Sequence, residues 1–219
     1  MKPIIFSGEM VRAILDGRKT MTRRVIKPQP AKDYIFCYCN RPGGDWCTNK
    51  NPNKTWAMFR PQNWPEATTA FDQKYGHGDT LWVRETWSGN GYIDGKQLFI
   101  YKADLDECGR ISSENLDEAD IKWRPSIHMP KEACRLFLKI TDLRIQRLRG
   151  ITEEDALKEG CKVCKGGYVF PGTAYDKIGL CHGSPEMAFQ VMWGELYPDG
   201  GINPWVVAII FEIIKIPAN

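Results

Sequence analysis

Residues 17–24 read Gly-Arg-Lys-Thr-Met-Thr-Arg-Arg and gather cationic and hydroxyl side chains in one short segment. From Gly17 to Lys32 the chain has six Lys or Arg residues and no Asp or Glu. A lysine amine can serve as a general base when its pKa is lowered, and a threonine hydroxyl can serve as a nucleophile when a base lies beside it. The segment therefore predicts a site for an anionic or carbonyl-bearing ligand, with hydrolytic chemistry within reach.

A strand and a short amphipathic helix are expected before this segment. Residues 2–6 are apolar enough for a strand, and Ser7 is a suitable helix N-cap. An apolar stripe follows over residues 10–15, and Gly17 stands where a left-handed C-terminal cap is expected. The cationic cluster is thereby placed at a helix-to-strand junction.

The segment itself alternates as a strand over residues 20–26. Alternation places Thr20, Thr22 and Arg24 on one face, and Met21, Arg23 and Val25 on the other. Lys19, in the turn, can point to either face. The alternative interpretation is a solvated basic strand with ordinary threonines.

Composition gives little support for a large polyanion-binding surface, since the net charge of the 219 residues is only +3. The charge is uneven, however: residues 122–149 carry eight Lys or Arg against two acids, and residues 94–120 carry eight acids against three bases. This pattern favours a local polyanion contact over a wrapping one, and ordinary solvated faces are the alternative.

The N-terminus lacks an apolar segment of the length that a secretory signal has. The longest apolar run, residues 205–211, is too short to cross a membrane. We therefore expect a soluble, cytoplasmic protein with no membrane partner. The oligomeric state is left open.

Eight cysteines without an export signal favour thiols or a metal over disulfides. Cys161 and Cys164 have the spacing of metal ligands, and Cys181 with His182 follows, so a structural zinc site is one interpretation. There is no second such cysteine pair and no evident fourth ligand, so reduced thiols are the expectation. Cys37, Cys39 and Cys47 form another loose group.

Further elements are predicted along the chain. Residues 80–87, 98–103, 133–141, 143–148 and 205–216 are expected strands, and residues 152–160 and 184–196 are expected helices. Insertions are expected at about 27–75, 88–122 and 161–182. The aromatic residues of the first insertion argue against disorder, and fit a satellite core or a stacking surface for bases. The prediction is a single α+β domain built on a small β-barrel with flanking helices and long loops.

Several motifs together resemble one known family, the ASCH domains with their PUA-like β-barrel fold. They are the Gly-Arg-Lys-Thr-x-Thr-x-Arg segment at 17–24, the Gly-Asp-x-Leu-x-Val strand at 78–83, the Leu-x-x-Ile-Thr-x-x-x-Ala-x-x-Glu-Gly segment at 148–160 and the closing apolar strand. The segment at 123–130 is more specifically similar to the large ASCH proteins encoded by bacteriophages and prophages.

The resemblance implies a function directed at RNA or a modified nucleoside. Some small ASCH proteins are amidohydrolases that remove the acetyl group of N4-acetylcytidine, and others are ribonucleases or RNA binders. The catalytic Lys, Thr and Glu of the amidohydrolases match Lys19, Thr22 and Glu159 here, and the family's Arg matches Arg24. No cofactor is implied. The large insertions are the departure from the family pattern.

Two catalytic schemes remain open for such an amide hydrolysis. In one, Lys19 activates the hydroxyl of Thr22 and Glu159 returns the proton to the leaving amine. In the other, Lys19 and Glu159 activate a water and Thr22 positions the carbonyl. A purely structural Lys19–Glu159 ion pair is the alternative to both.

Additional substrate-binding candidates are Thr20, Arg23, Arg24, Trp82, Arg84, Ser126 and His128. Ser126 and His128 lie in a proline-bracketed segment expected at the barrel mouth. Arg84 shares the face of Trp82 on its strand by alternation. Two non-catalytic functions compete with the enzyme: an RNA-binding module, and a phage accessory protein that acts through protein contacts.

Overall fold

The computed structural model describes residues 1–31, 34–39, 55–61, 69–93, 96–105, 110–111, 116–117, 121–198 and 202–215. The chain divides into two compact units, each built from distant segments. Unit 1 comprises Met1–Arg18, Thr80–Leu138 and Ile213–Asn219, and unit 2 comprises Lys19–Asp79 and Lys139–Glu212. The sequence predicts a single domain.

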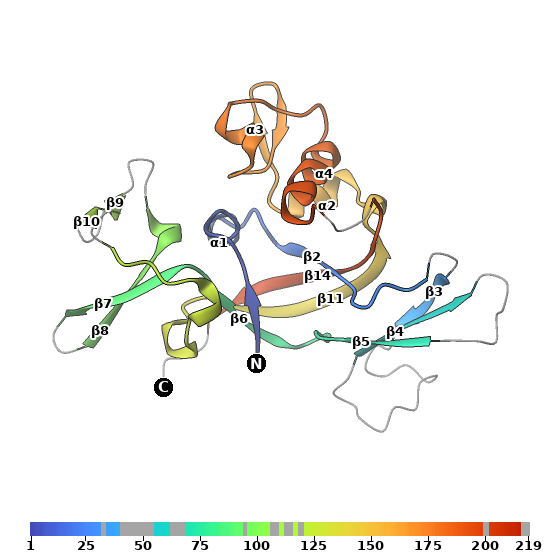
Figure 1. Ribbon diagram of the computed structural model, residues 1–219, viewed down its shortest axis with the longest axis horizontal. Helices are drawn as coiled ribbons and strands as arrows, with labels where there is room; N and C mark the ends of the chain where they lie inside the picture. The colour runs from blue at the N-terminus through green and yellow to red at the C-terminus, as the bar shows by residue number, and fades with distance from the viewer. Residues whose placement is uncertain are drawn as a thin grey trace. The chain divides into compact units, whose positions relative to one another are not determined.

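Unit 1 is built around the parallel pair of β1 and β6, which are in register from Lys2↔Leu81 to Ile5↔Arg84. Its other elements are one helix, a hairpin, a second short strand pair and single 3-10 turns (Figure 1). Its elements are β1 (Lys2–Ile5), α1 (Gly8–Leu15), β6 (Thr80–Arg84), β7 (Trp87–Ile93), β8 (Lys96–Tyr101), η1 (Lys102–Asp104), β9 (Arg110–Ile111), β10 (Leu116–Asp117), η3 (Ser126–His128), η4 (Lys131–Ala133) and the first two residues of β11 (Phe137–Arg147).

Helix α1 begins and ends where the sequence predicts. The side chain of Ser7 accepts a hydrogen bond from the backbone of Met10, and Gly17 has the left-handed φ of 74°. Arg12 fixes this helix to η1, because its guanidinium donates to the carbonyl oxygens of Ala103 and Leu105 at 3.0 and 3.4 Å.

Unit 2 contains an antiparallel arrangement in which β14 lies between β2 and the main part of β11. A separate three-stranded sheet, a small hairpin and three helices complete it. Its elements are β2 (Met21–Val25), β3 (Tyr34–Cys39), β4 (Thr55–Pro61), β5 (Thr69–Gln73), the remainder of β11, η5 (Leu148–Gly150), α2 (Glu153–Lys158), β12 (Lys162–Cys164), β13 (Gly167–Val169), α3 (Ala174–Lys177), α4 (Pro185–Leu196) and β14 (Trp205–Ile214), whose last two residues belong to unit 1.

The core of unit 2 forms where α4 and α2 pack together; the two helices lie side by side in Figure 1. On α4, Ala188, Phe189 and Met192 are buried, whereas Met187 and Leu196 are 57% and 48% exposed. β14 is buried on both faces over its first half, as its continuous apolar sequence predicts.

The observed fold is mixed α+β, with more sheet than helix among the described residues. β1 in unit 1 and β2 in unit 2 are edge strands and do not pair with each other. The described residues therefore do not form the closed barrel that the sequence predicts. The two strands expected at 133–141 and 143–148 are one continuous strand, β11. Thr141 and Asp142, at the predicted break, continue the strand without a turn. Among the described helices, none has the length and apolarity that a membrane span requires.

Candidate functional site

Lys19 and Glu159 meet in the interior of unit 2. The Lys19 Nζ donates to the Glu159 Oε2 at 2.8 Å and to the Glu159 backbone oxygen at 2.7 Å. Both side chains are almost inaccessible, at 1% and 3% exposure. Two of the three residues expected to be catalytic are thus in direct contact.

Local structure explains why these two residues meet. Lys19 follows the end of α1 and forms an isolated backbone bridge with Glu159 just before β2 begins. Glu159 is the C-cap of α2, whose N-cap, Thr152, accepts a hydrogen bond from the backbone of Asp155. Gly160 then leaves the helix with a φ of 105°, a conformation that favours glycine.

Arg23 joins Glu159 from the neighbouring strand. Its Nη1 donates to the second carboxylate oxygen, Oε1, at 3.0 Å, and its Nη2 donates to the Asp155 Oδ2 at 2.6 Å. The Arg23 side chain is completely buried, and its guanidinium lies 5.5 Å from the ring centroid of Phe189 on α4. Arg23, expected to bind substrate, holds two protein carboxylates in this structure.

The network continues to the surface through Asp155. The second oxygen of Asp155, Oδ1, accepts a hydrogen bond from the Arg144 Nη2 at 2.7 Å, and the Arg144 side chain is 40% exposed. Lys19, Glu159, Arg23, Asp155 and Arg144 therefore form one chain of contacts, called the ion network below.

The protonation of the network follows from its burial. Desolvation lowers the pKa of Lys19; the Glu159 carboxylate opposes this effect, and the charges of Arg24 and Arg23 add to it. Burial alone would raise the pKa of Asp155, but the Arg144 hydrogen bond and the charges of Arg23 and Arg144 lower it. Lys19 is thus the member of the network whose charged form burial disfavours.

Thr22 lies on the opposite face of β2 from this network. β2 and β14 pair without a break in register from Met21↔Ile210 to Val25↔Val206, so successive side chains alternate. Arg23 Nη1 lies 3.3 Å from the Sδ of Met21, which places these two side chains on one face. Thr22 is buried on the other face, and the structure does not bring its hydroxyl to Lys19.

Thr20 and Arg24 share the face of Thr22 by the same alternation. Both are half-buried. The backbone of Thr20 donates to the Lys158 oxygen at 2.9 Å and accepts from the Phe211 amide at 3.0 Å, which fixes the chain between Lys19 and β2. Arg24 influences the site through its charge, as one of the groups that lower the pKa of Lys19.

The remaining candidates form a separate group in unit 1. Arg84 lies over the ring of Trp82, with its guanidinium carbon 5.3 Å from the ring centroid, and donates to the Ile127 oxygen. Ser126 and His128 lie in η3, where Ser126 is half-buried and His128 is exposed. Trp82 and Arg84 share a face as the alternation predicts.

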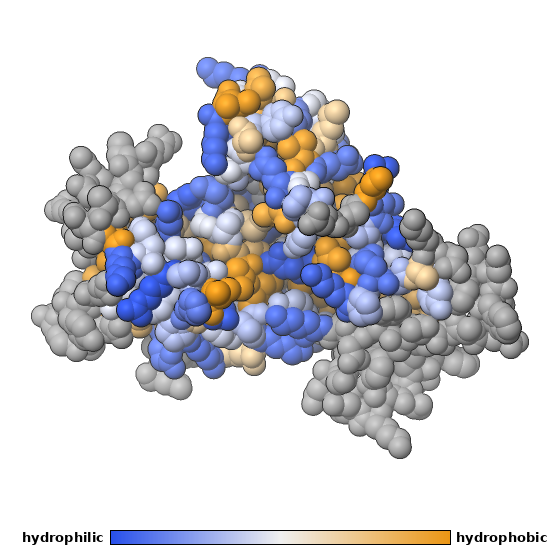
Figure 2. Space-filling model, viewed as in Figure 1, coloured by the Kyte–Doolittle hydropathy of each residue, from blue (hydrophilic) through white to orange (hydrophobic). Residues whose placement is uncertain are grey.

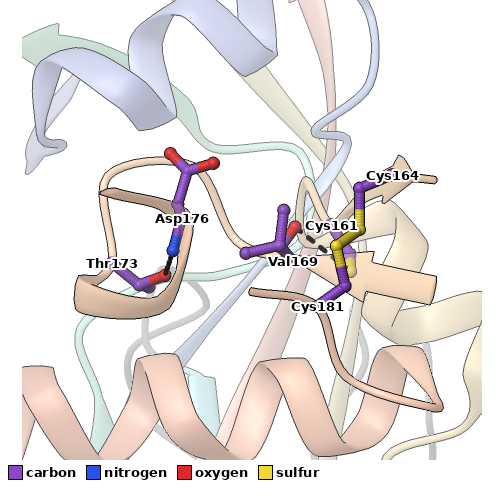
Figure 3. Close-up of a disulfide and its surroundings, with 6 residues drawn as sticks. All are labelled: Cys161, Cys164, Val169, Thr173, Asp176 and Cys181. Carbon is purple, nitrogen blue, oxygen red and sulfur yellow. Dashed lines mark hydrogen bonds between the residues drawn. A yellow bond between two sulfur atoms is a disulfide. The ribbon is translucent and has the colours of Figure 1, made fainter. Parts of the chain in front are cut away.

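The cysteines of residues 161–182 differ from both interpretations of the sequence. Cys164 and Cys181 form a disulfide with their Cα atoms 6.7 Å apart, and Cys161 is a buried free thiol (Figure 3). The free-thiol expectation is therefore wrong for Cys164 and Cys181. The three sulfurs do not form the zinc site either, and no group of three or more metal-binding side chains occurs within the described ranges. Cys47 and the side chains of Cys37 and Cys39 lie outside the described residues.

Sequence reasoning missed Asp155 and Arg144 as members of the site. A signal for Asp155 exists, because it precedes Glu159 by four residues and such a spacing places both carboxylates on one helix face. For Arg144, the sequence shows only a position on a strand of alternating polarity. Its partner, Asp155, is identified only from the folded structure.

Comparison of the chain with protein-family models, with curated proteins and with solved structures gives no match. The functional assignment therefore rests on the motifs of the sequence and on the geometry of the site.

Proposed function

We propose that this protein is a PUA-like ASCH protein directed at RNA or a modified nucleoside, and that unit 2 hydrolyses the acetamide of N4-acetylcytidine-type substrates without a metal. The observation that carries the proposal is the buried Lys19 amine, 2.8 Å from the Glu159 carboxylate and with a lowered pKa. A lysine whose pKa is lowered by burial is more often in the neutral form that a general base requires.

In the proposed reaction, Lys19 takes a proton from a water molecule. The oxygen of that water attacks the acetyl carbonyl carbon of the substrate. The carbon–nitrogen bond of the tetrahedral intermediate then breaks, and the proton passes to the leaving cytosine amine. The products are acetate and cytidine. Glu159 stabilises the protonated form of Lys19 between these two steps. The opposite orientation of Thr22 on β2 favours water over the Thr22 hydroxyl as nucleophile.

Substrate access requires a displacement of neighbouring side chains, because the Lys19 side chain is only 1% exposed. Sites that close around their substrates exclude water in the same way. The proposal thus includes an opening step before binding.

The test is the conversion of N4-acetylcytidine to cytidine by purified protein, followed by chromatography. Lys19→Met should reduce kcat at least about a thousandfold, because it removes the base. Lys158→Met is the matched control, since the Lys158 side chain is 44% exposed and pairs with the exposed Glu154 four residues earlier. No turnover by the wild type, or equal turnover by Lys19→Met, would refute the amidohydrolase.

A second candidate is a non-catalytic RNA-binding module. It is favoured by the burial of the Lys19–Glu159 pair, which suits a structural brace, and by the half-exposed or exposed cations of β11 and η5, namely Lys139, Arg144, Arg147 and Arg149. Its test is binding to a single-stranded RNA at two salt concentrations. Affinity should fall with salt and with Arg149→Glu, in the absence of nucleoside turnover.

A further inference from the structure

The residues that follow Glu159 form a small structure closed by the disulfide, here called the cysteine module (residues 161–182). β12 and β13 pair from Lys162↔Val169 to Cys164↔Gly167, and the backbone of His182 exchanges two hydrogen bonds with Tyr168, at 2.7 and 2.8 Å. The Cys164–Cys181 bond therefore ties the first strand of this structure to its last segment (Figure 3).

The outer and inner sides of the cysteine module differ. Val163, Ile178 and Leu180 are 67%, 68% and 52% exposed, and Figure 2 shows apolar side chains at the top of the view, where Figure 1 places α3. On the inner side Val169 and Phe170 are buried, and β13 packs against α4. Val169, Phe170 and the packing of β13 against α4 therefore join the module to the rest of unit 2.

Two short paths connect the module to the ion network. Along the chain, the amide of Cys161 donates to the oxygen of Ala156 in α2 at 3.3 Å, next to Glu159. Through space, the ring of Phe170 lies 5.9 Å from that of Phe189, edge to face, and Phe189 lies 5.5 Å from the guanidinium of Arg23. Arg23 in turn holds the Glu159 carboxylate at 3.0 Å.

We propose that the Cys164–Cys181 disulfide is a redox switch of the ion network: the oxidised module holds Phe170 against Phe189 and so keeps Arg23 and Glu159 in place, and reduction releases them. The regulatory part of this inference rests on the proposed function. The structural part, the coupling of the disulfide to α2, stands independently of turnover.

The reductant is a dithiol, either a small molecule or a protein of that class. Its thiolate attacks one sulfur of the disulfide, the sulfur–sulfur bond breaks, and a mixed disulfide forms. The second thiol of the reductant then displaces the protein sulfur. Two electrons and two protons reach Cys164 and Cys181, which end as thiols, and the reductant ends as its own disulfide. Cys161 is a poor internal attacker, because burial raises the pKa of its thiol to about 11.

The experiment compares oxidised and dithiothreitol-reduced protein by amide hydrogen exchange and by turnover, with the redox state of each cysteine mapped by alkylation and peptide mass spectrometry. Reduction should increase exchange in residues 153–161 and lower kcat about tenfold, since a small displacement of catalytic groups is costly. The double variant Cys164→Ser, Cys181→Ser should resemble the reduced protein and no longer respond to reductant. Cys134→Ser is the matched control, because it removes a free thiol of unit 1 and should preserve the response.

Equal exchange of residues 153–161 in oxidised and reduced wild-type protein would overturn the switch, whatever the activity. So would full alkylation of Cys164 and Cys181 before reduction, with no change in exchange after a disulfide-forming oxidant. A change in exchange without any turnover would instead refute the proposed hydrolase and leave the coupling in place. Because the first comparison uses the wild type, it does not depend on the folding of the serine variant.

Discussion

Each unit contains a buried carboxylate paired with arginine, and the two sites differ in what else is present. In unit 1, Glu85 is buried and accepts two hydrogen bonds from Arg135, both at 3.0 Å. Arg135 is 26% exposed, also binds Asp104 at 2.7 Å, and lies 3.9 Å from the ring centroid of Tyr101. In unit 2, Glu159 is shared between Arg23 and a fully buried lysine.

The difference separates a structural ion pair from a candidate site. Burial raises the pKa of both Glu85 and Tyr101, the latter to about 12, and the charge of Arg135 opposes both shifts. In unit 2, burial instead lowers the pKa of Lys19, so this amine gives up its proton more readily than an exposed lysine does. A buried salt bridge alone is therefore weak evidence for a functional site. The buried lysine is the group that distinguishes unit 2.

The largest stability loss is expected from Arg23→Met. This change leaves Asp155 and Glu159 buried without the guanidinium that joins them, and should cost about 3–5 kcal/mol of unfolding free energy. Urea unfolding of the variant and the wild type measures it. A loss below about 1 kcal/mol would show that water or a shifted side chain replaces Arg23.

Arg135→Met should cost less, about 2 kcal/mol, because Arg135 lies nearer to solvent and water can reach part of the space it leaves. The same unfolding experiment tests it. Turnover of N4-acetylcytidine, if present in the wild type, should be retained, since Arg135 belongs to unit 1 and the ion network to unit 2. A selective loss of kcat in a stably folded variant would contradict the contrast between the two sites.

Lys19→Met should change the pH dependence of stability. The pKa of Lys19 is lowered in the folded protein from 10.5, so the unfolded chain binds more protons between the folded and unfolded pKa values. The stability of the wild type relative to Lys19→Met should therefore rise with pH through this window and fall as pH decreases, by about 1.4 kcal/mol per pH unit at most. Unfolding at pH 7.5 and pH 10 measures the difference, and the opposite slope would mean a raised pKa.

Arg144→Met should have the smallest effect of the network, about 0.5–1 kcal/mol, because the Arg144 side chain is 40% exposed and solvent screens its contact with Asp155. The remaining contact of Asp155 with Arg23 still pairs its charge. Acid titration of stability provides the readout: the part that depends on Asp155 is present above pH 3.8, is lost as pH falls through the lowered pKa, and should shrink in the variant. An Arg144 effect as large as that of Arg23 would contradict this order.

The sequence predicts the local elements of the site well. The cap at Ser7 and the left-handed Gly17 occur as expected, and the helix predicted over residues 152–160 forms as α2, because each depends on short-range backbone chemistry. The contact of Lys19 with Glu159, which the sequence offers as a structural ion pair, is present in the structure.

The remainder depends on distant partners. The face chosen by Lys19 is set by Glu159, 140 residues away, so strand alternation alone leaves it open. Arg23 looks like a ligand contact in the sequence because its buried partners, Asp155 and Glu159, are invisible there. The disulfide between Cys164 and Cys181 depends on the pairing of Tyr168 with His182, which brings the last segment beside β13.

Helix α2 carries a constraint on length as well as on composition. Asp155 and Glu159 reach the same guanidinium because they are four residues apart on a helix of six residues, Glu153–Lys158, and its C-cap. An inserted or deleted residue between them would rotate Glu159 by about 100° around the helix axis and turn it away from Arg23 and Lys19. Homologous chains can therefore differ in the length of the loops on either side of α2, whereas the number of residues in α2 itself is constrained.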